Sequence, residues 1–490
     1  MVPQFNLAEH VLRRGAQTQD KLAFSVIGPA RAERWSYARL IAAVRGTATG
    51  LLARGLRPGQ RVLIRVGNEP AFPVAYLGAI AAGLVAVPTS PALTAREATA
   101  IAQGIRPALV VAGPGVALPE GGWPVLDTAG LAGFAALPPA PFAMGDPERP
   151  GYIVFTSGSS GRPRAVVHAH RAILARGMMM QGWYGLGEGD RLLHAGAFNW
   201  TFTLGTGLMD PWTMGATTLI PAPGTAIEQI PLLAARHGAS ILAAAPGVFR
   251  RMLRADWRVW DALRRGLTAG ERLAPDLRAA WRARTGTDLH EAMGMSECST
   301  FLSGSPARPA PEGFAGYPQP GRRLALLDEA GAEVPAGQAG LLAVHRSDPG
   351  LFLGYDGAPE ETAARFMGEW FVTGDLGRAG ADGAIAMLGR GDDMMNAGGY
   401  RLSPAEVEEV LAAVPDAGDV AVTELAVASG ARIVCAFWTG AAPRAALEAA
   451  AGAGLADYKR PRDYVRLEAL PRTNTGKIDR RRLREDHRKG

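Results

Sequence analysis

The sequence predicts an α/β protein with a large N-terminal domain of parallel sheets flanked by helices, a small β-barrel-like subdomain and a small C-terminal α+β domain. Short apolar runs alternate with helical stretches before about residue 315, which indicates parallel strands covered on both faces. Beyond that point turn signals recur at short intervals, as in antiparallel sheets. The 490 residues are also too many for one ordinary core.

The N-terminal domain is expected over residues 1–390. Its predicted strands include the apolar runs RVLIRVG (61–67), ALVVAG (108–113), TTLIPAP (217–223) and SILAAAP (240–246). The stretch IEQIPLLAARHG (227–238) predicts a helix between two of them. AYLGAIAAGLVAV (75–87) is too short to span a bilayer, and it predicts a buried helix that continues through Gly83 into a strand.

A β-rich subdomain is expected over about residues 315–390 and a C-terminal domain over residues 391–490. SPAEVEEVLAAV (403–414) predicts a helix, with Ser at the N-cap and Pro at the first helical position. DVAVTEL and RIVCAFW predict two strands, and PRAALEAAAGAG predicts a second helix. Together these elements make a small α+β module.

Composition and charge exclude several classes of protein. The net charge of +6 is small for this length, so no nucleic-acid partner is implied. Cys298 and Cys435 make neither a disulfide framework nor a zinc site. The N-terminus is typical of an amphipathic helix with Leu7, Val11 and Leu12 on one face, not of a signal peptide. We therefore expect a cytoplasmic protein without a membrane span.

Lysine is rare in this chain. Of 52 basic residues only Lys21, Lys459, Lys477 and Lys489 are lysines. The compact ammonium of Lys and the planar guanidinium of Arg differ in geometry and hydration. A Lys within a motif therefore suggests that an ammonium is needed there.

The segment YIVFTSGSSGRPRAVVH (152–168) places a loop of small residues directly after a predicted buried strand. It is not a Walker P-loop, because no Gly-Lys-Ser/Thr follows and Pro163 has no backbone N–H. Glycines let a ligand approach the backbone, and Arg164 adds a cation for phosphate oxygens. The loop therefore indicates phosphate binding, with a surface turn as the alternative. Its candidate binding residues are Thr156, Ser157, Gly158, Ser159, Ser160 and Gly161.

Two further stretches of the N-terminal domain fit a nucleotide. TAGE (268–271) places small residues between a strand and a helix, where a flat ring could lie on the backbone. HEAMGMSEC (290–298) carries Glu297, a carboxylate after a glycine turn that is suited to hold Mg²⁺ beside phosphates. A solvated surface glutamate is the alternative.

Two stretches nearer the C-terminus complete the set. EWFVTGDLG (369–377) carries Asp375, which we expect on a tight turn and able to accept hydrogen bonds from ribose hydroxyls. PRTNTGKIDR (471–480) presents Lys477 after a Thr-Gly turn. A turn Asp and a surface Lys are the alternatives, but all the motifs in this order indicate one nucleotide site.

On these motifs the sequence resembles the adenylate-forming superfamily of acyl- and aryl-CoA synthetases, nonribosomal-peptide adenylation domains and luciferases. The match runs from NLAEHVLRRGA to TGKIDR, nearly the whole chain. The resemblance implies an ATP-dependent acid–CoA ligase that forms an acyl-AMP, releases pyrophosphate and transfers the acyl group to CoA. It implies ATP, Mg²⁺ and coenzyme A as cofactors, and a C-terminal domain that pivots at Asp392 between the two half-reactions. A monomer or homodimer is expected.

The resemblance assigns roles to residues of the N-terminal domain. Arg164 and Ala165 stand where the phosphate loop of the family usually has Lys and Gly. Ser296 would bond the α-phosphate, Glu297 the magnesium ion and Glu291 the adenine amino group. The remaining positions of the implied nucleotide site are Gly270, Glu271, Ala292, Met293, Gly294 and Met295.

The resemblance also assigns roles to residues that follow in the chain. Lys477 corresponds to the catalytic lysine of the family, which acts together with Glu297 and Arg164. Asp375 and Arg390 correspond to the pair that binds ribose. NAGGYRLSP looks like the hairpin that lines the CoA channel, with Gly398, Gly399 and Tyr400.

Within the superfamily, GRGDDMMNAGGYRLSPAEVEEVL and FMGEWFVTGDLG most resemble the benzoate-CoA ligase branch and neighbouring medium-chain acyl-CoA synthetases. Met293, in place of an aromatic residue, fits that branch. Benzoate-type ligases place a His shortly after the motif glutamate, whereas this chain has Ser299 and Thr300. A small aromatic, cyclic or medium-chain acid is therefore expected rather than benzoate in particular. The implied acyl pocket consists of Trp200, Thr201, Phe202, Ala269, Ala292 and Thr300.

Alternatives to this interpretation stay open. Trp200 and Phe202 would equally suit a core. The enzyme could load the phosphopantetheine of a carrier protein instead of free CoA. The chain could also be a nucleotide- or acyl-binding regulator that has lost catalysis, although retention of Glu297, Asp375 and Lys477 argues against this.

Overall fold

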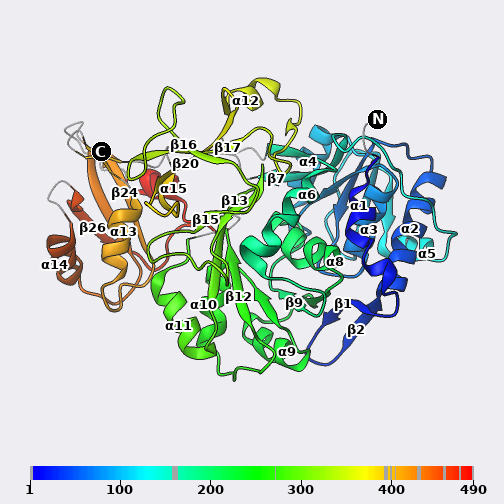
Figure 1. Ribbon diagram of the computed structural model, residues 1–490, viewed down its shortest axis with the longest axis horizontal. Coiled ribbons are helices and arrows are strands. Elements are labelled where there is room, and N and C mark those ends of the chain that lie inside the picture. Colours follow the sequence, from blue (N-terminus) through cyan, green and yellow to red (C-terminus); the bar gives the residue numbers. More distant parts are fainter. Residues whose placement is uncertain are drawn as a thin grey trace. The chain divides into compact units, whose positions relative to one another are not determined.

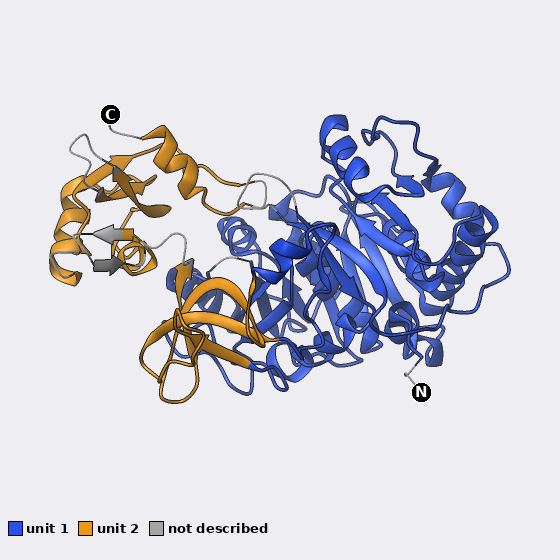
Figure 2. Ribbon diagram, turned by 90° about the horizontal axis from the view of Figure 1, so that it is seen from above, with its two compact units in different colours: residues 1–158, 163–323, 346–364 blue, residues 159–162, 324–345, 365–490 orange. Residues whose placement is uncertain are grey.

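The computed structural model describes residues 4–156, 164–270, 272–390, 395–397, 400–402, 404–426, 432–455, 459–473 and 476–487. The chain divides into two compact units, which Figure 2 distinguishes by colour. The first comprises Met1–Gly158, Pro163–Arg323 and Arg346–Ala364, and the second comprises Ser159–Arg162, Leu324–His345 and Arg365–Gly490.

The first unit contains a nine-stranded sheet with the order β15-β14-β13-β12-β11-β9-β10-β1-β2. Figure 1 labels β15, β13, β12, β9, β1 and β2 of this sheet. Six consecutive strands of this sheet, β13, β12, β11, β9, β10 and β1, are parallel to one another. Strands β2, β14 and β15 pair with their neighbours in antiparallel orientation. The strands are β1 Leu22–Ile27, β2 Ala32–Ser36, β9 Arg191–His194, β10 Thr217–Pro221, β11 Ile241–Ala243, β12 Arg265–Ala269, β13 Leu289–Met295, β14 Ser299–Ser303 and β15 Tyr317–Pro318.

The same unit contains a seven-stranded sheet with the order β18-β8-β7-β4-β3-β5-β6. Strands β7, β4, β3, β5 and β6 are parallel, while β8 is antiparallel to both β7 and β18. The strands are β3 Arg61–Arg65, β4 Val85–Pro88, β5 Leu109–Ala112, β6 Val125–Asp127, β7 Pro150–Thr156, β8 Arg164–Ala169 and β18 Gly354–Tyr355.

Helices cover both faces of the nine-stranded sheet, as adjacent side chains of β9 show. Leu193 lies in one apolar core with Trp281 of helix α11 (Pro275–Thr285). Leu192 lies in a second core, together with Trp183. Successive side chains of a strand point to opposite faces, so the two cores flank the sheet. The predicted parallel sheet covered on both faces is confirmed.

The predicted N-terminal helix is α1, with Leu7, Val11 and Leu12 buried. The predicted buried helix at 75–87 is α3, and Gly83 has a φ of +76° before β4. Among the described residues no helix is both long and apolar enough to cross a membrane. The helices of this unit are α1 Leu7–Leu12, α2 Tyr37–Ala53, α3 Ala71–Ala81, α4 Ala95–Ile105, α5 Thr128–Phe134, α6 Ala172–Gly177, α7 Thr201–Leu204, α8 Asp210–Thr213, α9 Ile230–Arg236, α10 Pro246–Arg254, α11 and α12 Pro359–Ala363.

The described residues of the second unit form three sheets. An antiparallel sheet has the order β16-β17-β20-β19, with β21 paired to β20; β22 and β23 form a hairpin; β24, β25 and β26 form the third sheet. Helix α13 and strands β24 and β25 confirm the elements predicted from SPAEVEEVLAAV, DVAVTEL and RIVCAFW. The elements are β16 Leu324–Leu327, β17 Ala339–His345, β19 Phe366–Met367, β20 Trp370–Ala379, β21 Ile385–Arg390, β22 Met395–Ala397, β23 Tyr400–Leu402, α13 Pro404–Ala412, β24 Val420–Ala426, β25 Arg432–Trp438, α14 Arg444–Gly454, β26 Asp463–Arg466 and α15 Arg480–Asp486.

Candidate active site

Strands β7 and β8 bracket the predicted phosphate loop. Thr156, the last residue of β7, is the cross-strand partner of Arg164, the first residue of β8. The loop residues Ser157, Gly158, Ser159, Ser160 and Gly161 lie outside the described residues. The antiparallel pairing of β7 with β8 therefore fixes Arg164 at the mouth of this loop.

Arg164 contacts an acidic and an aromatic side chain of the first unit. Its guanidinium forms an ion pair with Glu361, in the first turn of α12. The guanidinium carbon also lies 5.3 Å from the ring centroid of Tyr355. The cation predicted from the motif thus has an anionic partner that the sequence did not suggest.

Glu297 follows β13 and is only 7% exposed. The Tyr355 hydroxyl donates a hydrogen bond to Glu297 Oε1 at 2.7 Å. The Phe352 N–H donates to the Glu297 carbonyl at 2.8 Å. Tyr355 is placed by β18, where it pairs with Val166 of β8. One tyrosine therefore links the predicted metal-binding carboxylate to the predicted phosphate-binding cation.

His168 of β8 supports the neighbouring turn. Its Nε2 lies 2.7 Å from the Ser296 carbonyl, which can only accept, so Nε2 carries the proton. Burial lowers the pKa of His168 to about 4, so the ring is neutral at physiological pH. This contact fixes the backbone of Ser296, the residue predicted to bond the α-phosphate.

The predicted adenine-binding stretches lie on adjacent strands. Ala269 of β12 pairs with Ala292 of β13, and Glu271 lies outside the described residues. Gly270 follows with a φ of +94°, and a Cβ there would come within 2.7 Å of the Trp200 ring. Glycine therefore lets an indole lie against the backbone at this point.

Glu291 makes a contact that its motif does not suggest. Its Oε1 accepts the Leu273 N–H at 3.0 Å, and its other oxygen lies 3.8 Å from the guanidinium of Arg278. Burial raises the pKa of Glu291 to about 7. The carboxyl thus anchors the chain before α11, and its contact with adenine stays a prediction.

The residues Met293, Gly294 and Met295 lie on the β13–β14 hairpin. Gly294 pairs with Thr300, and a Cβ at Gly294 would come within 2.4 Å of the Ser299 carbonyl oxygen. The glycine of the motif is therefore required by the close approach of the two strands.

Residues predicted for the acyl pocket come together in one apolar cluster. Trp200, Phe202, Ala269 and Ala292 all belong to the core that also contains Trp183. The Phe202 ring meets the Trp200 ring edge to face, with centroids 5.1 Å apart. Phe202 is buried, which is also what the core interpretation expects.

The last two predicted pocket residues lie at the edge of this cluster. Thr201 begins α7 and is partly buried. The Thr300 hydroxyl is buried and contacts the sulfur of Met179, a member of the cluster.

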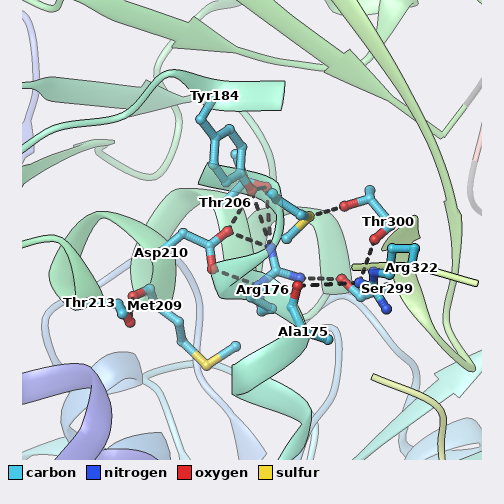
Figure 3. Close-up of polar contacts among 11 residues, drawn as sticks. Ala175, Arg176, Tyr184, Thr206, Met209, Asp210, Thr213, Ser299, Thr300 and Arg322 are labelled. Atoms are coloured by element: carbon cyan, nitrogen blue, oxygen red, sulfur yellow. Dashed lines mark hydrogen bonds and ion pairs between the residues drawn. The ribbon is translucent and has the colours of Figure 1, made fainter. Parts of the chain in front are cut away.

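Sequence reasoning missed a buried polar network beside this cluster (Figure 3). Arg176 donates from Nε and Nη2 to the two oxygens of Asp210, both at 2.6 Å, and Tyr184 and Thr206 join the network. A third nitrogen of Arg176 donates to the Ser299 hydroxyl. Ser299 has a φ of +63°, which is uncommon for a residue other than glycine. No local sequence motif predicts these contacts, because they join separate segments of the chain.

Two π-helical turns carry part of this network. They span Met180–Tyr184 and Gly205–Met209, and they supply Tyr184 and Thr206 respectively. π-helical turns are rare and frequently occur at functional sites.

In the second unit, the expectation that Asp375 lies on a tight turn is wrong. Asp375 lies inside β20 and is the direct cross-strand partner of Arg390 of β21. Gly374 has a φ of +84°, and the register shifts between Leu376 and Gly377. Such irregularities bend a strand without ending it, which explains why Thr-Gly-Asp resembled a turn.

Lys477 is exposed and follows Gly476, which has a φ of +88°. The Thr473 N–H donates to the Lys477 carbonyl at 2.7 Å, which ties the backbone of the lysine to that of Thr473. Tyr400 pairs with Ala397 in the β22–β23 hairpin. The hinge residue Asp392 and the glycines of the CoA channel, Gly398 and Gly399, lie outside the described residues.

Among the described residues no group of three or more His, Cys, Asp or Glu is arranged to hold a metal ion. Glu297 alone is the predicted ligand. Mg²⁺ is commonly bound by one or two carboxylates together with substrate phosphates. A single carboxylate therefore fits an ion that arrives with a nucleotide.

Comparison with known proteins identifies the family to which the chain belongs. A family model described as AMP-binding enzyme matches residues 11–356, and one described as AMP-binding enzyme C-terminal domain matches residues 406–477. The chain belongs to the AMP-binding enzyme family. The predicted superfamily, the fold class and the enzyme class, an AMP-forming acid–thiol ligase, are confirmed.

Named relatives of this AMP-binding enzyme include benzoate–CoA ligase of Thauera aromatica, 32% identical over 88% of this chain and 86% of that protein. A 3-hydroxybenzoate–CoA/4-hydroxybenzoate–CoA ligase of the same organism is 30% identical over 92% of this chain and 91% of that protein. The crystal structure of a benzoate CoA ligase from Burkholderia xenovorans matches with a TM-score of 0.87 and 27% identity, covering 98% of this chain and 100% of the other.

We expect Glu291→Gln to remove a pH dependence of stability from this AMP-binding enzyme. The ordinary pKa of 4.5 applies in the unfolded chain, whereas burial raises the pKa of the folded protein to about 7. The folded state therefore binds the proton of Glu291 more tightly than the unfolded chain does. This proton binding contributes fully to the free energy of unfolding below pH 4.5, and the contribution is lost as the pH rises through 7. Above that pH the variant should gain on the order of 2 kcal/mol in free energy of unfolding.

Urea unfolding at about pH 5 and pH 8 measures this difference. Gln keeps the acceptor for the Leu273 N–H, so the contact itself survives. Glu360→Gln, at an exposed position, serves as the control. Equal pH dependence in wild type and Glu291→Gln would contradict the prediction.

Proposed function

We propose that the enzyme activates a small aromatic carboxylic acid with ATP and Mg²⁺ and transfers it to CoA, with cyclic and medium-chain acids as further candidates. The observation that carries this proposal is the position of the aromatic cluster. Trp200 and Phe202 pack with Ala269, at the end of β12, and Ala292, within β13. The predicted adenine-binding residues lie on or directly after the same two strands. Aromatic walls over small floor residues suit a flat apolar ring.

The first half-reaction joins two anions. A carboxylate oxygen of the acid attacks the α-phosphorus, a new P–O bond forms, and the bond to the β-phosphate breaks to release pyrophosphate. The site must therefore offset several negative charges at short range. Arg164 and Lys477 are proposed to supply positive charge, and bound Mg²⁺ would add a charge beside Glu297.

The contacts around Glu297 support its proposed role. Tyr355 donates to one carboxylate oxygen, which orients the group and leaves the other oxygen for a ligand. Burial excludes water, and electrostatic interactions are stronger in such surroundings. Glu297 would therefore hold an ion in one position while the phosphates react.

The second half-reaction needs a thiol at the acyl-AMP. We propose that residues 1–390 bind ATP and the acid, and that residues 391–490 pivot at Asp392. The pivot would remove Lys477 and bring the hairpin at Gly398, Gly399 and Tyr400 to the pantetheine arm. Glycine has no side chain, so the arm could pass close to the backbone at Gly398 and Gly399. The thiol attacks the acyl carbon, and AMP leaves.

We predict that Lys477→Ala lowers the rate of adenylation about 100- to 1000-fold, the usual cost of losing one preorganised charge-stabilising donor. Thioester formation from a supplied acyl-adenylate should change far less. Single-turnover assays of each half-reaction measure the difference.

Lys459→Ala is a matched control, since Lys459 is ion-paired with Glu406 at 2.7 Å and has no proposed role in the reaction. It should leave both half-reactions unchanged. Equal losses in both half-reactions of Lys477→Ala would refute the proposed role.

We also predict that ATP–pyrophosphate exchange is at least about tenfold faster with benzoates, including hydroxy-substituted ones, than with saturated C2–C12 acids. Ala292→Val, which narrows the proposed pocket floor, should reduce exchange with aryl acids. Calorimetric melting checks that this variant folds.

The same panel tests the rival functions. Exchange without thioester formation from free CoA, but with a purified carrier protein, would favour carrier loading. Absence of exchange with every acid would favour a regulator.

A further inference from the structure

The cation of the phosphate loop already has an anionic partner within the first unit. The Arg164 side chain is 24% exposed and that of Glu361 39%, and the two groups are in direct ion-pair contact. The Tyr355 ring lies against the same guanidinium. Arg164 thus lies between a carboxylate and an aromatic ring at the mouth of the loop.

The position of Glu361 is set by the fold. Helix α12 begins at Pro359, directly after the turn that follows β18. The Thr362 hydroxyl accepts the Tyr355 N–H at 2.9 Å and donates to the Ala358 carbonyl at 3.0 Å. This ties the first turn of α12 to β18, and β18 pairs with β8, which begins at Arg164. The carboxylate is therefore held near Arg164 by a continuous set of contacts.

Two other nearby carboxylates already have partners, and a third is exposed to solvent. Asp356 forms a bidentate pair with Arg61, with both N···O distances 2.7 Å. Glu297 accepts the Tyr355 hydroxyl. Glu360, in the same turn as Glu361, is exposed. Glu361 is thus the carboxylate that faces the guanidinium of Arg164.

The ion pair with Glu361 does not use all the hydrogen-bond donors of Arg164. An Arg guanidinium has five N–H groups, and the Arg164 Nε is buried without a hydrogen-bond partner among the residues that the structure describes. A half-exposed ion pair is weak and exchanges readily. An incoming phosphate can therefore bind the remaining donors and displace the carboxylate.

We propose that Glu361 is a positioning residue that competes with the phosphates of ATP and pyrophosphate for Arg164. It orients the guanidinium before ATP binds, and it re-forms the ion pair when pyrophosphate leaves, which speeds product release. This inference rests on the proposed function, because it takes the loop to bind those phosphates. The guanidinium of Arg suits the role, since it can keep its contact with the Tyr355 ring while it exchanges anionic partners.

Direct binding of inorganic pyrophosphate by calorimetry tests the proposal. Glu361→Gln keeps the size of the side chain and removes its charge, so pyrophosphate should bind about two- to fivefold more tightly, the range expected for a half-exposed pair. Pyrophosphate release, followed in a single turnover, should slow by a similar factor. Glu360→Gln removes the same charge from the same helical turn and should change neither quantity.

A double-mutant cycle shows whether the effect passes through Arg164. In an Arg164→Ala background, Glu361→Gln should no longer change the affinity for pyrophosphate. An effect of equal size in that background, or none in the wild-type background, overturns the proposal while the proposed function stands. Wild-type protein that binds neither ATP nor pyrophosphate overturns both.

Discussion

The pairing of strand β8 with both β7 and β18 is the constraint on which the candidate site depends. At its start, β8 places Arg164 opposite Thr156, and further along it pairs with Tyr355. His168, near its end, holds the Ser296 carbonyl. One antiparallel strand thus positions the cation of the loop, the tyrosine that orients Glu297 and the backbone beside that glutamate. Displacement of β8 would disturb all of these groups together.

The fold could be predicted from sequence wherever local patterns determine it. Leu192 and Leu193 alternate between two cores because a strand has a two-residue period. Gly83 ends a buried helix because its φ is positive, a conformation that glycine adopts at little cost. Asp375 shows the limit of this reasoning, since Thr-Gly-Asp has turn-like residues but lies at an irregularity within β20.

The contacts around the site could not be predicted, because they join distant segments. Tyr355 is 58 residues from Glu297, and Asp210 is 34 residues from Arg176. Neither contact could be predicted from a sequence motif or from the spacing of the two residues. The motifs identified Arg164 and Glu297 as individual groups, whereas their connection through Tyr355 follows only from the pairing of β8 with β18.

Under the proposed function, the buried network around Arg176 bears on which acids the proposed acyl pocket accepts. Leaving a buried charge unpaired is costly, and the Arg176 donors are used by Asp210 and Ser299. Ser299 is one of the two residues that this chain has where benzoate-type ligases place a histidine after the motif glutamate. The Ser299 hydroxyl accepts a hydrogen bond from Arg176. The guanidinium of Arg176 is therefore not available to anchor the acid, and under the proposed function discrimination would come mainly from the shape of the apolar walls at Trp200 and Phe202. A pocket of that kind separates ligands by size and flatness more than by single polar substituents.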